Sequence, residues 1–240
     1  MKIIYSVALG GALMLSVQAV QAAIALDRTR AILDGGEKAI ALTIRNDNPH
    51  LPYLAQAWLE DLEGHRITGP LIAVPPVQRV EPATKSQISI SSLPSVSTLP
   101  QDRESAFYFN VREIPPRSDK ANVMQVALQT KIKVFYRPSS ITPKPGDVWQ
   151  DKLVLTKLSS GYQVENPTPF YVTVIGLSGS PKGLVKDFKA VMIAPKSTVK
   201  VQARNYDSPY MTYINDYGGR PTLKYRCQGS VCRAEPHQES

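Results

Sequence analysis

The sequence predicts an all-β protein made of two β-sandwich domains. Its β-branched and aromatic residues come in short runs between turn residues, and proline is abundant, with 20 among 240 residues. Both features are typical of β-sandwiches. No long amphipathic helical pattern with capping residues is found. Residues 23–240, which follow an N-terminal leader, are enough for two domains of about 100 residues each.

The first 22 residues have the layout of a secretory signal peptide. Lys2 supplies a positive start, residues 3–17 are mostly apolar, and small residues precede a predicted cleavage between Ala22 and Ala23. A membrane anchor is the alternative, but the apolar run is shorter than the roughly 20 residues that a spanning helix needs. We therefore expect a soluble mature protein outside the cytoplasm.

The first domain is predicted from five runs with strand character. Several alternate between apolar and polar residues, as half-buried strands do. Trp58 is the expected buried aromatic residue of the sandwich core. The strand candidates are Ala39–Arg45, Tyr53–Leu59, Ser86–Ser91, Ala106–Arg112 and Met124–Tyr136, of which the last is the longest.

The segment Ser139–Gly146 contains two prolines and a glycine, which predicts a linker. A second series of strands follows it. We therefore expect one domain at residues 23–141 and another at residues 146–235, with a cleft where they meet. The strand candidates of the second domain are Lys152–Lys157, Tyr162–Glu165, Phe170–Ile175, Ala190–Ile193, Tyr213–Ile214 and Thr222–Cys227.

Cys227 and Cys232 are the only cysteines. In an exported protein such a pair predicts a disulfide, here one that clips a C-terminal hairpin. The small loop that it closes predicts a stabilisation of about 2 kcal/mol. With His237 as the only histidine nearby, two thiols do not predict a zinc site.

The net charge is +8, or +7 without the leader, whose only charged residue is Lys2. A basic protein can bind nucleic acid, an anionic membrane or acidic partners. Export and the scatter of the basic residues along the chain argue against nucleic acid.

The motifs of common enzymes are absent from the sequence, and we expect neither catalysis nor a cofactor. His50, His65 and His237 lie in predicted turns or in the tail. Ser197 and Lys200 have the Ser-x-x-Lys spacing, but the companion motifs are missing, so a turn before a strand explains them better.

The longest strand candidate is the unusual feature of the chain. Met124, Val126 and Leu128 share one face, because side chains alternate along a strand. Pattern alone favours an ordinary core strand. The other interpretation is an edge strand whose apolar row is offered to a partner, since an exposed apolar edge is otherwise an aggregation hazard.

These residues lie within a chain that resembles the periplasmic pilus chaperones over nearly the whole predicted mature sequence. Motifs this long and this numerous are highly specific, and they change the interpretation of the Met124 strand. The stretches that carry the resemblance are Leu99–Pro116 (LPQDRESAFYFNVREIPP), Leu26–Arg30, Asn46–Asn48, Leu51–Trp58, Pro75–Arg79, Gln129–Lys133, Glu165–Pro169 and Tyr213–Gly219.

The resemblance implies two immunoglobulin-like domains in an L shape and a periplasmic chaperone that binds, folds and caps pilus subunits. Met124, Val126 and Leu128 are then the donor residues, which complete the subunit's sandwich by donor-strand complementation. Arg30 and Lys133 are the cleft residues that hold the client's C-terminal carboxylate. Because alternation puts Lys133 on the face opposite Met124, we expect twist or a bulge to aim it into the cleft.

The resemblance also assigns Glu104, Arg137 and Asp216 to an ion-pair group between the domains. The implied partners are pilins, adaptor and adhesin subunits, and an outer-membrane usher that receives them for fimbria biogenesis. The short stretch from Pro115 to Val123 resembles the branch of the family that serves rod-like pili.

Two other classes of protein are weighed against a chaperone. A pilin would be exported and β-rich, but it has one incomplete sandwich and not two complete strand series. An exported hydrolase would need a nucleophile constellation that the sequence lacks. The identity of the pilus and the self-association of the free protein, which would cover its edge strand, are left open.

Overall fold

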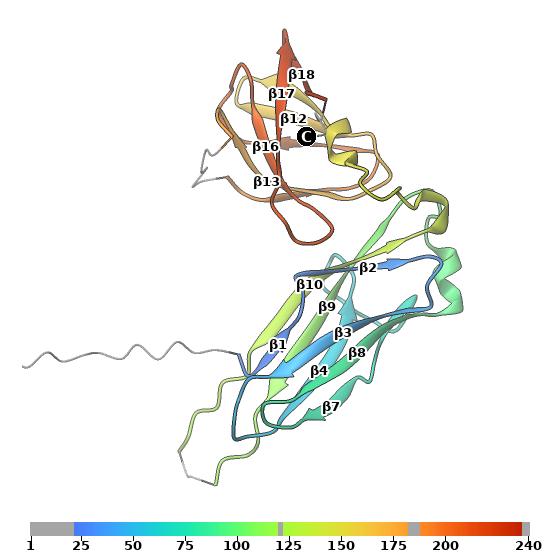
Figure 1. Ribbon diagram of the computed structural model, residues 1–240, viewed down its shortest axis with the longest axis vertical. Helices are drawn as coiled ribbons and strands as arrows, with labels where there is room; N and C mark the ends of the chain where they lie inside the picture. Colours follow the sequence, from blue (N-terminus) through green and yellow to red (C-terminus); the bar gives the residue numbers. More distant parts are fainter. Residues whose placement is uncertain (1–21, 120–121, 182–187, 237–240) are drawn as a thin grey trace, which may run out of the picture.

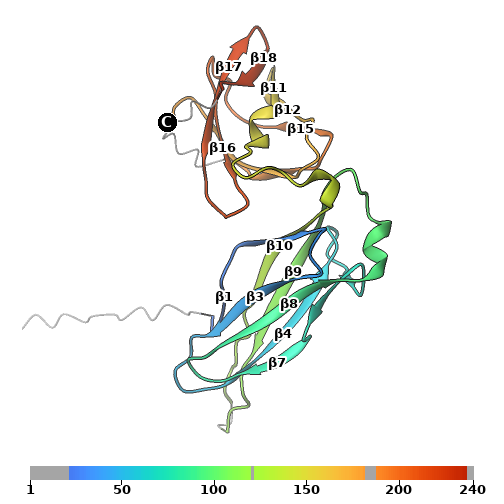
Figure 2. The same ribbon diagram turned by 45° about the vertical axis from the view of Figure 1, so that its right-hand side comes forward.

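The structure, a computed structural model, describes residues 22–119, 122–181 and 188–236. Apart from Ala22, the predicted leader lies outside the described residues. The prediction of two immunoglobulin-like sandwich domains is confirmed, and Figures 1 and 2 show them set at an angle to each other. Among the described residues, no helix is long and apolar enough to cross a membrane.

The first domain is a sandwich of two sheets. One sheet has the order β1-β3-β8-β6, and the other has the order β2-β10-β9-β4-β5, with β7 also paired to β4. The strands of the first sheet are β1 (Ile24–Leu26), β3 (Ala39–Asn46), β8 (Lys85–Ser92) and β6 (Leu71–Val74). The strands of the second are β2 (Arg30–Asp34), β10 (Gln129–Arg137), β9 (Ser105–Ile114), β4 (Tyr53–Glu60), β5 (Arg66–Ile67) and β7 (Val77–Val80).

The core of this domain lies between the two sheets. Leu42, Phe109 and Val134 are fully buried there, which removes apolar surface from water. The prediction that Trp58 belongs to this core is wrong. The inward positions of β4 are taken by Ala55, Ala57 and Leu59, so period-two alternation puts Trp58 on the outer face.

On that outer face Trp58 is held by charged neighbours. The guanidinium of Arg66 lies 4.2 Å from the centre of the indole ring and that of Arg112 lies 5.7 Å from it. The indole Nε1 donates a hydrogen bond of 2.6 Å to Glu60, which also pairs with Lys131 at 2.6 Å. Trp58 therefore belongs to a polar network on the surface of the sheet.

The expected strand from Met124 to Tyr136 is shorter than predicted, because β10 begins at Gln129. Residues 123–128 are not in a strand. Pairing with β9 extends from Gln129 to Tyr136, and β2 pairs with β10 only from Lys133 onwards. The physical reason is a lack of partners, since a ladder needs repeated backbone hydrogen bonds and this stretch has one to β9, at Leu128.

The second domain begins after a linker and is one continuous path of strands, in the order β14-β13-β16-β17-β18-β11-β12-β15. β17 pairs with β16 through its first residues and with β18 through its last, so it connects the two halves of the sandwich. The strands are β11 (Val154–Leu158), β12 (Gly161–Asn166), β13 (Val172–Ser178), β14 (Val191–Ile193), β15 (Ser197–Val201), β16 (Tyr210–Ile214), β17 (Thr222–Gln228) and β18 (Val231–Ala234).

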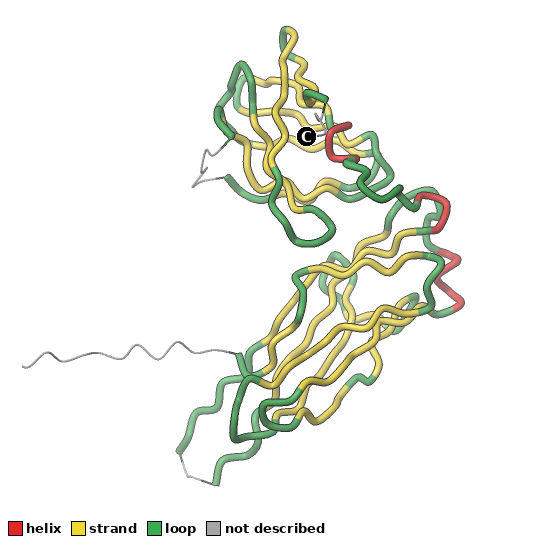
Figure 3. Tube along the Cα trace, viewed as in Figure 1, coloured by secondary structure: helices red, strands yellow, loops and turns green. Residues whose placement is uncertain are grey.

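Helical structure among the described residues is limited to short 3-10 turns, drawn red in Figure 3. They are η1 (Pro94–Thr98), η2 (Ser139–Ile141) and η3 (Trp149–Lys152). The last two flank the segment that joins the domains, where Pro143 and Pro145 prevent a regular helix or ladder.

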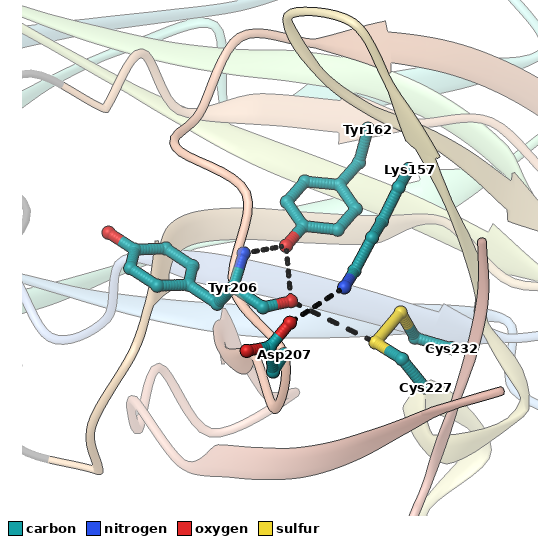
Figure 4. The surroundings of a disulfide bond; sticks show 6 residues. All are labelled: Lys157, Tyr162, Tyr206, Asp207, Cys227 and Cys232. Atoms are coloured by element: carbon teal, nitrogen blue, oxygen red, sulfur yellow. Dashed lines mark hydrogen bonds and ion pairs between the residues drawn. A yellow bond between two sulfur atoms is a disulfide. The ribbon is translucent and has the colours of Figure 1, made fainter. Parts of the chain in front are cut away.

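The predicted disulfide is present and joins β17 to β18. Cys227 and Cys232 are directly opposite each other in the ladder, so the bond clips the hairpin (Figure 4). The neighbouring segment is held by Tyr162, whose hydroxyl accepts a hydrogen bond of 2.8 Å from the amide of Tyr206. The Sγ of Cys227 lies 4.0 Å from the carbonyl oxygen of Tyr206, so the C-terminal hairpin contacts this segment.

Candidate functional site

Arg30 and Lys133 are direct register partners in the parallel ladder of β2 and β10. Their side chains therefore leave the same face of the sheet side by side. Ile132 and Val134 belong to the core of the first domain, so Lys133 points to the outer face. The pairing of Gln129–Tyr136 with β9 is unbroken. The expectation of a twist or bulge that redirects Lys133 is therefore wrong, because the second domain lies on this outer face.

Both cations contact the second domain. The Nη1 of Arg30 donates a hydrogen bond of 3.2 Å to the carbonyl of Ile214, and the Nζ of Lys133 donates one of 3.4 Å to the hydroxyl of Thr173. Arg30 is only 8% exposed, and its Nε has no hydrogen-bond partner. Within the described part of the chain, neither cation has an ion-pair partner.

The electrostatics of this junction favour an anion. Burial lowers the pKa of Arg30, because the charged guanidinium loses contact with water. Burial also lowers the pKa of Lys133, and the adjacent positive charge of Arg30 lowers it further. The carboxylates of Asp216 and Glu104 act on the pKa of Arg30 in the opposite direction, but neither forms an ion pair with it. Two close cations that lack an ion pair are costly to bury. A bound carboxylate would neutralise both cations and accept their free hydrogen bonds.

The predicted donor residues lie below this junction, on the stretch that precedes β10. Met124 is 89% exposed and Val126 is 58% exposed, whereas Leu128 is half-buried. The stretch is attached at its end, where the amide of Glu113 donates a hydrogen bond of 3.0 Å to the carbonyl of Leu128. Large apolar side chains exposed this fully in a row mark a surface for a partner.

Glu104, Arg137 and Asp216 form one ion-pair group. The Nη2 of Arg137 lies 2.7 Å from Glu104 and 2.9 Å from Asp216. The same guanidinium is 5.1 Å from the ring centres of Trp149 and Phe170. Since Glu104 and Arg137 come from the first domain and the other three residues from the second, this group joins the domains.

Backbone contacts reinforce this joint. The second carboxylate oxygen of Glu104 accepts a hydrogen bond of 2.7 Å from the amide of Tyr171, and the amide of Glu104 donates one of 2.9 Å to the carbonyl of Pro169. Gly218 has a φ of +82°, and a β-carbon built on it would lie 2.8 Å from the hydroxyl of Thr29. The loop after β16 therefore favours glycine for its backbone angle, and it lies close to the first domain at this point.

Sequence reasoning missed the residues of the second domain that contact the two cations. Thr173 is a β13 residue within an apolar run, and Ile214 contributes only its carbonyl. Nothing in the local pattern distinguishes either of them from a core strand residue. They could be found only from the fold, which brings β13 and β16 to the first domain.

Comparison with known proteins identifies the family of the chain. Residues 23–142 match the family described as pili and flagellar-assembly chaperone, PapD N-terminal domain, and residues 148–225 match the C-terminal domain of the pili assembly chaperone PapD. The chain is 59% identical to the chaperone protein PapD of Escherichia coli, over 90% of this chain and 91% of that one. It is 47% identical to the chaperone protein PmfD of Proteus mirabilis, over 96% and 94% of the two chains.

A solved structure of a chaperone has a similar fold. The crystal structure of the Pseudomonas aeruginosa CupB2 chaperone is similar with a TM-score of 0.70 and 33% identity, over 85% of this chain and all of that one. The fold and the junction define a two-domain immunoglobulin-like chaperone. The chain belongs to the family of pili assembly chaperones. It is thus a chaperone for pilus subunits and not an enzyme, and the pilin and hydrolase alternatives are rejected.

Proposed function

We propose that the chain acts in the periplasm by holding a pilus subunit at two places at once. Arg30 and Lys133 bind the subunit's C-terminal carboxylate, and Met124, Val126 and Leu128 fill the groove of its incomplete sandwich. The chaperone then delivers the capped subunit to an outer-membrane usher. A single observation carries this proposal. Buried Arg30 on β2 and partly buried Lys133 on β10 are register partners without an ion pair among the described residues, and β10 continues from an unpaired apolar segment.

The two places are connected by the strand geometry. Leu128 and Met124 precede Lys133 by five and nine residues, which corresponds to roughly 17 and 30 Å along an extended chain. A carboxylate fixed at Lys133 sets the register of a client strand laid along this segment. Register matters because a slip of one residue turns every client side chain to the wrong face.

The donor residues and the carboxylate anchor each contribute several kcal/mol to the binding of a subunit. Burial of three large apolar side chains stabilises a complex by roughly 5–9 kcal/mol before the cost of ordering is subtracted. Each charge-assisted hydrogen bond to the carboxylate adds about 1.5–3 kcal/mol. Backbone pairing along the donor segment is insensitive to the client's sequence, which suits a chaperone with several clients.

The test is co-expression of the chaperone with a pilus subunit, followed by measurement of the soluble complex. We expect Arg30→Ala and Lys133→Ala each to abolish the complex, because an unpaired buried carboxylate is very costly. Lys85→Ala, which removes an exposed cation from the other sheet, is the matched control and should leave the complex intact.

Thermal unfolding of each free variant shows whether the loss reflects binding or folding. The anchor assignment requires variants that unfold at the wild-type temperature. Subunits with an amidated C-terminus should likewise form no stable complex with the wild-type chaperone. Folded Arg30→Ala and Lys133→Ala proteins that still protect the subunit from degradation would contradict the assignment.

A further inference from the structure

Glu113 is a buried carboxylate for which the described residues supply no cation. Its side chain lies on β9, and the residue is 5% exposed. The other two buried glutamates of the described chain have partners, since Glu60 pairs with Lys131 and Glu104 pairs with Arg137. A buried carboxylate without a positive partner is costly, so the source of a compensating charge for Glu113 needs an explanation.

The contacts of Glu113 join the start of the described chain to the base of the donor segment. Its Oε2 accepts a hydrogen bond of 3.0 Å from the amide of Ile24. Its Oε1 accepts one of 3.4 Å from the amide of Leu128, and its own amide donates to the carbonyl of the same residue. The carboxylate therefore lies between the first residues of β1 and the last of the three donor residues.

Ala23, the residue expected to begin the mature chain, immediately precedes Ile24, whose amide donates a hydrogen bond to this carboxylate. It is 8% exposed, and its carbonyl accepts a hydrogen bond of 2.7 Å from the amide of Asp47. Consecutive backbone nitrogens are at most about 3.7 Å apart, so the nitrogen of Ala23 lies within about 7 Å of the Oε2 of Glu113. A terminal amino group at this site can turn toward the carboxylate, because no preceding residue restrains it.

We propose that removal of the leader completes a buried ion pair between the new α-ammonium group of Ala23 and Glu113. Water hydrolyses the peptide bond between Ala22 and Ala23, the carboxylate leaves with the leader, and the freed amine of Ala23 takes up a proton. The pair holds Glu113 in place, and Glu113 holds the amide of Leu128. Glu113 is thus a positioning residue for the base of the donor segment, an inference that rests on the proposed leader and donor assignments.

The direct test is a titration of the α-amino group in the mature protein, whose first residue is verified by mass spectrometry. The methyl carbon shift of Ala23 reports the protonation of its own nitrogen in an NMR titration. An ordinary α-amino group has a pKa of about 7.7–8.0. We expect the pKa of Ala23 to lie at least about one pH unit higher, a tenfold tighter binding of the proton.

Glu113→Gln should return this pKa to the ordinary range, whereas Glu37→Gln, the matched change at an exposed site, should leave it raised. An ordinary pKa in the unmutated mature protein would overturn the proposal. The titration of the unmutated protein therefore tests the proposal even if the Glu113→Gln variant does not fold.

A second measurement follows the amide of Leu128 by hydrogen exchange. A chain that retains Gln21 and Ala22 before Ala23 moves the terminal charge away, and we expect its Leu128 amide to exchange about tenfold faster. Glu113→Gln should have a similar effect, and the two changes together should add little. Exchange that is unaffected by the extension would contradict the proposal. Both measurements use the free chaperone, so their outcome is independent of whether Arg30 and Lys133 bind a client.

Discussion

The last strands of the two domains differ in how completely they are paired. β18, which ends the second domain, pairs with β17 on one side and β11 on the other, and the disulfide joins it to β17. β10, which ends the strands of the first domain, pairs with β9 along most of its length but with β2 only from Lys133 to Arg137. Its continuation toward Met124 has no ladder at all.

This difference separates two functions of a final strand. A strand that only closes a sandwich gains stability from partners on both sides and from a covalent bond. A strand that serves a second molecule must keep its backbone groups and apolar side chains available. In the proposed function the first domain combines the two, since the C-terminal half of β10 belongs to the core and the segment before this strand is exposed.

The largest expected effect comes from the same substitution made once within β10 and once in the segment before it. Val134 is fully buried and Val126 is 58% exposed. Val134→Asp places an unpaired carboxylate in the core and should lower the free energy of unfolding by at least about 4 kcal/mol. Val126→Asp should change it by no more than about 0.5 kcal/mol. Urea unfolding of both variants measures the difference.

Val126→Asp should nevertheless weaken the complex with a pilus subunit, because a charged side chain cannot fill an apolar groove. Equal destabilisation by the two substitutions would show that residue 126 is packed in the free protein. Unchanged subunit binding by the folded Val126→Asp protein would remove this residue from the donor set.

The ion-pair group at the end of β10 predicts a pH dependence. Burial raises the pKa of Glu104 from 4.5 to about 7, although Arg137 and the amide of Tyr171 favour its ionised form. The folded protein therefore binds this proton more tightly than the unfolded chain. The contribution to stability is full below about pH 4.5 and is lost as the pH rises through 7, a change of about 3 kcal/mol.

Glu104→Gln should remove this dependence, and Glu165→Gln, an exposed control, should retain it. Urea unfolding between pH 5 and 8 measures the slope for each protein. Parallel curves for wild type and Glu104→Gln would show that Glu104 does not titrate in this range.

The smallest expected effect belongs to the clipped hairpin of the second domain. Replacement of both Cys227 and Cys232 by serine should lower the free energy of unfolding by about 2 kcal/mol, because the closed loop is short. The affinity for a subunit should stay the same, since the hairpin carries none of the proposed client contacts. Full stability of the double variant would show that ladder pairing alone holds β18.

Much of the fold could be predicted from local pattern, but the faces and partners of the strands could not. Alternation in β4 shows that Trp58 and Ala57 lie on opposite faces, and it does not say which face is buried. The small residues turned out to face the core. The length of the last strand of the first domain was overestimated for a related reason, because a run with strand character forms a ladder only where a partner exists.

The prediction of the site depended on a resemblance and not on chemistry visible in the sequence. Arg30 and Lys133 are far apart along the chain, and only the parallel pairing of β2 with β10 makes them neighbours. Parallel register across such a separation leaves no local signal. The disulfide is the opposite case, because two cysteines separated by a short turn suffice to predict it.

The loop that carries Gly218 lies against the first domain at Thr29. A β-carbon at position 218 would lie 2.8 Å from the Thr29 hydroxyl, and the φ of +82° disfavours any residue other than glycine. A larger residue at this position would require the loop or the exposed Thr29 side chain to shift. The contact between the domains near Arg30 thus depends on the shape of this loop as well as on the charges around it.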